Sequence, residues 1–91
     1  MSVSFIVVEL RFFGALSKIF TGPLFFNVEV GKTLGSLRNA LVLFVKKNTS
    51  SFEDDYLLID AVFSNYNSIL SDSFVLQVDQ KFFVLPPASG G

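Results

Sequence analysis

The first apolar segment of the chain, residues 3–13, alternates between two sets of side chains. Its β-branched and aromatic residues favour a β-strand, in which successive side chains point to opposite faces of the sheet. Glu9 and Arg11 need water, so we expect Phe13, which shares their parity, to face outward with them. The alternation predicts that the inward set consists of Ser4, Ile6, Val8, Leu10 and Phe12.

A turn and a second strand are predicted next. Gly14 is expected to end the first strand, and residues 15–20 to form a short helical turn that ends near residues 21–23. Residues 24–30 alternate again and suit a hairpin partner of the first strand. Their predicted inward set is Leu24, Phe26, Val28 and Val30.

The apolar spacing changes to three and four residues after a predicted turn at residues 31–32. Thr33 is a favourable N-cap for a helix that we expect to end near Asn48. Lys46 and Lys47 would then lie in the last turn, where positive charge suits the helix dipole. The buried stripe of this helix is predicted to comprise Leu34, Leu37, Leu41, Phe44 and Val45.

Shorter elements are predicted in the C-terminal half. The expected segments are, in order, a polar loop at 49–55, a third strand at 57–63, a turn at 64–68, a short strand near 69–70, a polar link at 71–73, an apolar segment at 74–78, a turn at 79–80 and a last strand at 81–85. In the last strand Lys81 needs water, so Phe83 and Leu85 are expected to face outward with it. Phe82 and Val84 would then point into the core.

The order of these elements is β-β-α-β-β, which predicts an α+β domain with one main helix packed across one face of a mixed sheet. Ninety-one residues suit one domain. We expect residues 1–91 to form that single domain, with a globular core at 1–85 and an extended tail at 86–91.

Composition excludes several classes of function. A formal net charge of −1 offers no basic surface for a nucleic-acid backbone. The sequence contains no cysteine and no histidine, so it can form neither a disulfide nor a thiolate nucleophile, and it lacks the commonest general base. Glu53, Asp54 and Asp55 are consecutive, but their side chains would point in different directions, so we interpret them as a solvated loop rather than a metal site.

The chain is expected to be cytoplasmic and not to associate with a membrane. No basic residue precedes the first apolar run, and Glu9 lies within that run, which is unlike a signal peptide. No run reaches the roughly 20 apolar residues that a membrane span needs.

We predict an apolar patch on the sheet face away from the helix. It would consist of the outward-facing Phe13, Phe83 and Leu85, together with Tyr66. A contiguous exposed patch of this kind usually marks a partner surface. The alternative is a strand register shifted by one residue, which would place these side chains in the core.

The chain ends in Pro86-Pro87-Ala88-Ser89-Gly90-Gly91. The two prolines favour an extended conformation, and six extended residues reach about 20 Å, far enough to enter the active site of another protein. Because Gly90 and Gly91 lack side chains, a narrow channel could close around the backbone and leave the terminal carbonyl open to attack. The alternative is a frayed terminus or an expression scar.

The whole chain resembles the ubiquitin-like sulfur carriers of β-grasp fold, and most closely the small subunit of molybdopterin synthase, the MoaD type, and the match rests on two segments. One is Val8-Glu9-Leu10-Arg11-Phe12-Phe13-Gly14-Ala15-Leu16, and the more specific one is Phe83-Val84-Leu85-Pro86-Pro87-Ala88-Ser89-Gly90-Gly91. Thiamine-pathway carriers, the ThiS type, share Gly-Gly but usually lack Pro-Pro. The family commonly has Asp-Gly-Asp before the last strand, where this chain has Val78-Asp79-Gln80.

The resemblance implies a subunit that catalyses nothing alone and binds no cofactor itself. A ubiquitin-activating-like adenylyltransferase would adenylate Gly91 with ATP and magnesium, and a sulfur donor, a sulfurtransferase, would convert it to a thiocarboxylate. With Gly90 beside it, that terminus would enter the large catalytic subunit of a heterotetrameric synthase and deliver sulfur to cyclic pyranopterin monophosphate. The resemblance assigns Phe13, Leu85 and Tyr66 to partner binding, and we expect Phe83, Pro86 and Pro87 to contact the partner as well.

Three other functions are open on the sequence. The first is sulfur delivery to thiamine or tRNA through the same thiocarboxylate. The second is protein modification, with Gly91 forming an isopeptide bond to lysines. The third is an adaptor domain with an inert tail.

Overall fold

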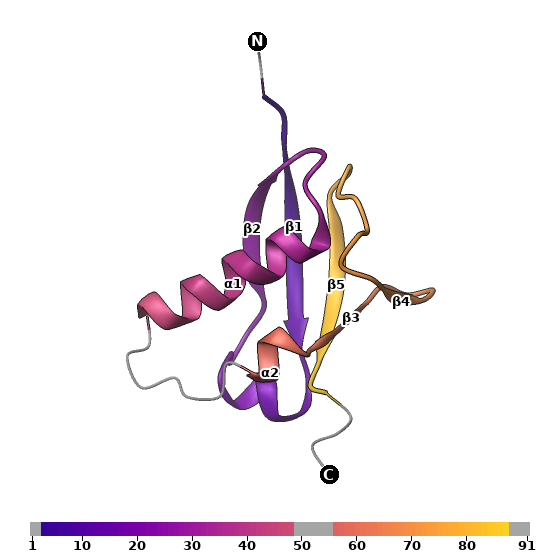
Figure 1. Ribbon diagram of the computed structural model, residues 1–91. Coiled ribbons are helices and arrows are strands. Elements are labelled where there is room, and N and C mark those ends of the chain that lie inside the picture. The colour runs from indigo at the N-terminus through magenta and orange to yellow at the C-terminus, as the bar shows by residue number, and fades with distance from the viewer. Residues whose placement is uncertain (1–2, 49–55, 88–91) are drawn as a thin grey trace.

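The computed structural model describes residues 3–48 and 56–87, and in these ranges the chain forms a five-stranded sheet with one long helix across one face (Figure 1). The elements are β1 (Phe5–Phe12), a 3₁₀ helix η1 (Gly14–Lys18), β2 (Leu24–Glu29), α1 (Leu34–Asn48), α2 (Tyr56–Ile59), β3 (Val62–Ser64), β4 (Ile69–Leu70) and β5 (Gln80–Leu85). The predicted α+β class with one main helix on a mixed sheet is confirmed.

The strands lie in the order β2-β1-β5-β3-β4. β1 pairs antiparallel with β2 and parallel with β5, and β3 pairs antiparallel with both β5 and β4. The first and last strands of the described chain are therefore neighbours in the centre of the sheet, and they run in the same direction (Figure 1).

The alternation in β1 and β5 is as predicted. Ile6, Val8, Leu10 and Phe12 are buried on the helix side of β1, and Phe82 and Val84 are fully buried in β5. Two residues predicted to face inward are exposed instead, Ser4 before β1 and Val30 after β2. Both lie just beyond the ends of the strands, where the Val30 amide donates to the Ser4 carbonyl at 2.9 Å but the helix does not cover them.

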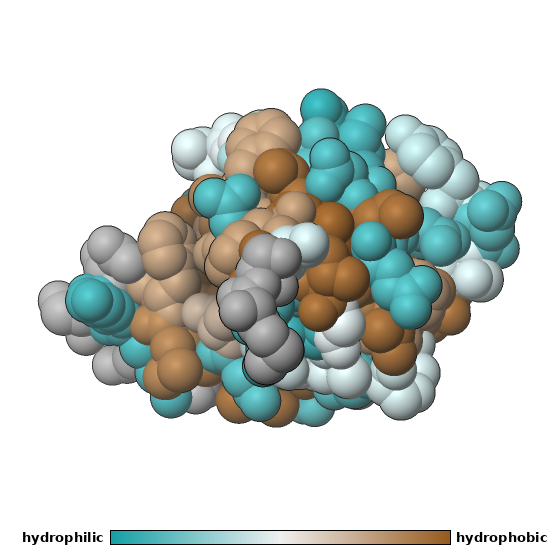
Figure 2. Space-filling model, turned by 90° about the horizontal axis from the view of Figure 1, so that it is seen from above, coloured by the Kyte–Doolittle hydropathy of each residue, from teal (hydrophilic) through white to brown (hydrophobic). Residues whose placement is uncertain are grey.

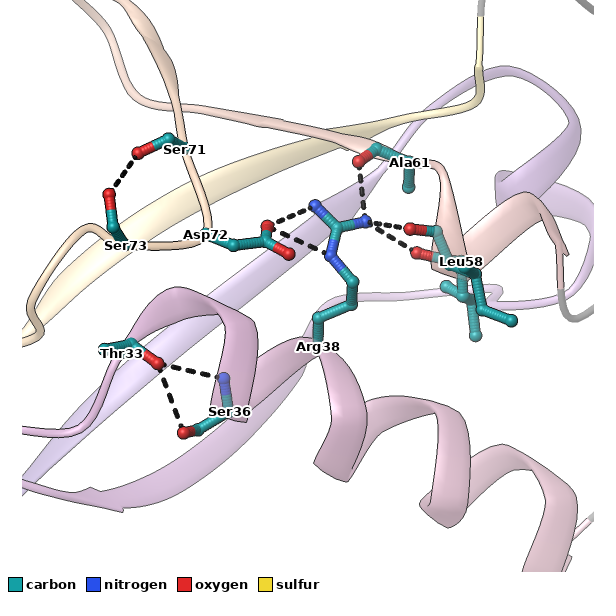
Figure 3. A network of polar contacts seen from close by, with 9 residues as sticks. Thr33, Ser36, Arg38, Leu58, Ala61, Ser71, Asp72 and Ser73 are labelled. Carbon is teal, nitrogen blue, oxygen red and sulfur yellow. Dashed lines mark hydrogen bonds and ion pairs between the residues drawn. The ribbon is translucent and has the colours of Figure 1, made fainter.

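The start of α1 is capped as predicted. The Thr33 hydroxyl oxygen accepts a hydrogen bond from the Ser36 amide at 3.2 Å, which satisfies a free donor of the first turn (Figure 3). The buried stripe consists of Leu34, Leu37, Leu41 and Val45. Phe44 was expected in this stripe but is 42% exposed, because it lies on the flank of the helix and packs edge-on against Phe26 with ring centroids 5.8 Å apart.

The predicted strand at residues 57–63 is wrong in its first half. This segment forms α2 and then only the short strand β3. The buried residues Leu58 and Ala61 are three positions apart, which is the spacing of a helical turn. The buried residues Ala61 and Phe63 are two positions apart, which is the spacing of a strand. The predicted turn at 64–68 and the short strand near 69–70 are present, and the Asn65 side chain closes the turn by accepting from the amides of Asn67 and Ser68.

Arg38 on α1 joins the irregular segments on either side of β3 (Figure 3). One terminal nitrogen of its guanidinium donates to the carbonyls of Leu58, Ile59 and Ala61 at 2.8, 2.9 and 2.7 Å. The other nitrogens contact the Asp72 carboxylate at 2.9 and 3.2 Å. The guanidinium also lies 4.8 Å from the centroid of the Phe63 ring, and its side chain is only 11% exposed.

Residues 71–79 cross the end of the sheet without forming a regular strand. Leu76 in this segment is fully buried, and its amide and carbonyl pair with the Lys32 carbonyl and the Gly31 amide. The Asp79 carboxylate accepts a hydrogen bond from the Val7 amide at 2.8 Å. Because β5 begins at Gln80, the predicted turn at 79–80 is shorter than expected.

Many apolar side chains lie on the described surface, as the 51% hydrophobic composition requires. Figure 2 shows apolar groups among polar ones at the end of the sheet where β1 begins. The exposed apolar residues include Val3, Phe5, Phe25 and Leu43. No described helix is long and apolar enough to cross a membrane.

Candidate functional site

Four apolar side chains meet on the sheet face opposite α1, near the C-terminal end of β5. We call them the outer apolar patch, which consists of Phe13, Tyr66, Phe83 and Leu85. The Phe83 ring lies at the centre, with the Phe13 ring centroid 5.8 Å away and the Tyr66 centroid 5.1 Å away, both in edge-to-face contact. Phe13, Phe83 and Leu85, with Ser64, line a shallow depression.

The strand register explains why these residues gather. In the sheet, Phe83 pairs with Arg11 of β1 on one side and with Ser64 of β3 on the other. The small Ser64 side chain leaves room above β3, and the turn that follows it carries the Tyr66 ring onto Phe83. Phe13 is 46% exposed and Tyr66 76%, so the patch is open to a partner.

The alternative register, in which these side chains would be core, is excluded. The neighbouring residues of opposite parity, Phe82 and Val84, are fully buried in contact with the rest of the core. Leu85 is 37% exposed at the end of the strand. The outward placement predicted from Lys81 is therefore the placement in the structure, whereas the partner-binding role of these residues stays a prediction.

Charged side chains lie beside the patch on the same face. The Arg11 Nε atom is 2.5 Å from a carboxylate oxygen of Glu9, and Lys81 of β5 lies opposite Glu9 in the backbone register of the sheet. The Arg11 side chain is 50% exposed, so this ion pair contributes little to stability. The patch is thus bordered on one side by charges of both signs.

The chain leaves the sheet directly beside the patch. The Phe13 amide donates to the Val84 carbonyl at 3.1 Å, which extends the pairing of β1 with β5 by one step. Pro86 and Pro87 follow Leu85 and are half-buried. Gly14 lies against the Pro86 ring. The sequence predicted Gly14 only as the end of a strand, because its contact with Pro86 depends on the pairing of β1 with β5.

Two predicted site residues, Gly90 and Gly91, lie outside the described residues. The acidic residues of the predicted solvated loop, Glu53, Asp54 and Asp55, lie outside them as well. Among the described residues, no three side chains of histidine, cysteine, aspartate or glutamate cluster in a way that could hold a metal ion.

No protein-family model matches the sequence, and no curated protein matches it. Solved structures do match the fold. A ubiquitin from Caldiarchaeum subterraneum is 16% identical with a TM-score of 0.63, over 97% of this chain and 100% of the other. Small archaeal modifier protein 1 from Haloferax volcanii is 19% identical with a TM-score of 0.67, over 93% of this chain and 99% of the other.

The HVO 2177 protein, also from Haloferax volcanii, is 19% identical with a TM-score of 0.64, over 96% of this chain and 88% of the other. At these identities the likeness concerns the fold. Together with the mixed sheet, its parallel central pair and the single long helix, these matches show that the chain has the ubiquitin-like β-grasp fold.

Proposed function

We propose that this protein is the sulfur carrier subunit of a molybdopterin synthase, with the carboxyl group of Gly91 as the reactive group. The observation that carries the proposal is that the outer apolar patch continues directly into the sequence Pro86-Pro87-Ala88-Ser89-Gly90-Gly91. A partner that covers the patch would receive the tail beside it. Six extended residues would bring the last glycine about 20 Å into that partner.

The chemistry begins with a carboxylate that is a poor electrophile, since its reference pKa is near 3.5 and it is ionised at neutral pH. A partner adenylyltransferase would use ATP and magnesium to join a Gly91 carboxylate oxygen to the α-phosphorus, with release of pyrophosphate. Hydrosulfide from a sulfur donor would then attack the carbonyl carbon. The new carbon–sulfur bond would replace the bond to the AMP oxygen, AMP would leave, and Gly91 would carry a thiocarboxylate.

The acceptor is proposed from the resemblance of the tail to that of the molybdopterin synthase small subunit. In the large catalytic subunit of the synthase, the thiocarboxylate would transfer sulfur to cyclic pyranopterin monophosphate, one atom in each cycle. The Pro-Pro pair before Gly-Gly favours this acceptor over the thiamine precursor. The chain contains neither histidine nor cysteine, so in this proposal the acid and base groups belong to the partners.

Intact-mass spectrometry tests the proposal. The protein purified from its source shows first whether Gly91 carries the free carboxyl group. Incubation with an activating enzyme, ATP, magnesium and sulfide should then add about 16 Da, the difference between sulfur and oxygen, and a variant that lacks Gly91 should stay unchanged. The proposal fails if the mass never increases, or if deletion of Gly91 leaves the activity of molybdenum enzymes intact in cells.

A second candidate function is protein modification through Gly91. It is favoured by the fold shared with a ubiquitin and with small archaeal modifier protein 1. In this case the activated glycine would form an isopeptide bond to lysines of other proteins. Blots of cell extracts distinguish the two, because a modifier leaves covalent adducts of higher mass that depend on Gly91, whereas a sulfur carrier leaves none.

A further inference from the structure

The two central strands separate at one pair of residues, Gly14 and Pro86. Arg11 pairs with Phe83 and Phe12 with Val84, so continuation of this register places Gly14 beside Pro86. Pro86 has no amide hydrogen and cannot extend the ladder. Gly14 has a φ of +61°, which turns the chain out of β1 and into η1 at the same level.

The space between these residues admits only glycine at position 14. A Cβ atom there would lie 2.9 Å from Cγ and 3.2 Å from Cδ of Pro86. The first distance is shorter than real carbon contacts, and the positive φ disfavours a side chain as well. A change of ring pucker can move Cγ, but Cδ is bonded to the backbone nitrogen and is also close at 3.2 Å, so full relief of the contact requires the backbone of Pro86 to move.

Hydrogen bonds and burial fix the position of η1, which begins at Gly14. The Gly14 carbonyl accepts a hydrogen bond from the Ser17 hydroxyl at 2.6 Å. The Leu16 carbonyl accepts from the amides of Ile19 and Phe20 at 3.1 and 3.0 Å, and the Leu16 side chain is fully buried. η1 is therefore anchored in the core, so that a collision at Gly14 would displace Pro86 rather than η1.

We infer that Gly14 is a positioning residue that sets the direction in which the C-terminal tail leaves the sheet. This role rests on the proposed function, since the direction matters only if Gly91 enters a partner's active site. Five residues beyond Pro86 span about 17 Å when extended, so a change of about 20° at Pro86 would move the last residue by about 6 Å. An error of about 1 Å already lowers the rate of a positioned reaction strongly.

The test uses two matched alanine variants. Gly14→Ala adds the Cβ that would meet Pro86. Gly31→Ala introduces a Cβ at another positive φ, +97°, where nothing lies within 4 Å, and so controls for backbone strain. The double variant Gly14→Ala with Pro86→Ala removes the ring atoms that the new Cβ would touch, and it is compared with Pro86→Ala alone.

Two measurements are made. The first is the nuclear Overhauser contact between the α-protons of residue 14 and the ring of Pro86, which needs no partner and is compared among the wild type, Gly14→Ala and Gly31→Ala. The second is the steady-state rate of pyrophosphate release with a ubiquitin-activating-like adenylyltransferase. We expect Gly14→Ala to lose the contact and to lower kcat about tenfold or more with KM within about twofold, because the outer apolar patch is unchanged. Gly31→Ala should resemble the wild type, and the double variant should match Pro86→Ala.

Two results would overturn the inference. The first is that Gly14→Ala keeps the contact with Pro86. The second is that the wild type is adenylated, but Gly14→Ala and Gly31→Ala change kcat by the same factor. A wild-type protein that no activating enzyme adenylates would instead overturn the proposed function. The nuclear Overhauser comparison then decides alone whether Gly14 sets the direction of the tail.

Discussion

At the scale of single residues, Arg38 makes the most long-range polar contacts described in this fold. We expect Arg38→Met to lower the free energy of unfolding by about 2–4 kcal/mol, because it removes the guanidinium donor from the carbonyls of Leu58, Ile59 and Ala61 while the apolar stem is kept. Of these carbonyls, that of Leu58 keeps a longer bond from the Ala61 amide at 3.3 Å. Urea denaturation followed by circular dichroism measures this loss. It is a large part of the roughly 5–15 kcal/mol that stabilises a domain.

Asp72→Asn is the matched control for the ion pair alone. The Asp72 side chain is 58% exposed, so the loss of its charge should cost at most about 1 kcal/mol. Equal effects of the two variants would show that the ion pair, and not the three carbonyl contacts, is the stabilising part of the network.

At the scale of elements, β2 forms an edge of the sheet with free backbone groups. The Val30 amide donates to the Ser4 carbonyl, and in an antiparallel pair every second residue directs its amide and carbonyl to the partner strand. The amides and carbonyls of Leu24, Phe26 and Val28 therefore point toward β1. The amides and carbonyls of Phe25 and Asn27 therefore point away from the sheet, and no partner for them is found in the described part of the chain. An apolar edge without lysine or proline is prone to pair with other chains.

We expect Phe25→Lys to slow aggregation of the concentrated protein several-fold without loss of stability. Phe25 is 62% exposed, so a lysine there reaches water and discourages pairing at the edge. Phe5→Lys is the control, since Phe5 is 63% exposed but lies on a strand inside the sheet. Static light scattering over time measures the effect, and the edge explanation is wrong if both substitutions slow aggregation equally.

The elements that sequence patterns predicted correctly are those whose patterns reflect burial on one side. β1, β2, α1 and β5 each carry a periodic apolar set, and the solvent requirement of Glu9, Arg11 and Lys81 assigns the faces. The segment at 57–63 could not be predicted in this way. A short apolar run suits a helix or a strand equally. Here the guanidinium of Arg38 favours the helix, because it donates to carbonyls at the end of α2, and Arg38 lies 20 residues before Leu58 in the sequence.

At the scale of the whole molecule, the sequence predicted which side chains share the outer apolar patch but not the contact between Gly14 and Pro86. Parity alone places Phe13 and Phe83 on one face once the charged residues are assigned. The contact of Gly14 with Pro86 depends on the parallel register of β1 and β5, which joins residues 72 positions apart. Neither strand contains a pattern that specifies this register.

A shared docking surface would make the two proposed partners bind in turn. The total accessible surface is 5776 Å², and a stable interface usually covers about 800 Å² of each protein. Two such interfaces centred on Phe13, Phe83 and Leu85 would overlap, and one Gly91 cannot occupy two active sites. The activating enzyme and the large subunit of the synthase should therefore compete for this protein.

Phe13→Asp should weaken both complexes about 100-fold, since it places a charge at the centre of the contact. It should cost less than about 2 kcal/mol of stability, because Phe13 is already half exposed. Phe5→Asp, on the same face of β1 but at its other end, should leave both affinities unchanged. Isothermal titration calorimetry with each partner, alone and in the presence of the other, measures affinity and competition together. A ternary complex, or equal losses for Phe13→Asp and Phe5→Asp, would show that the two partners do not share the outer apolar patch.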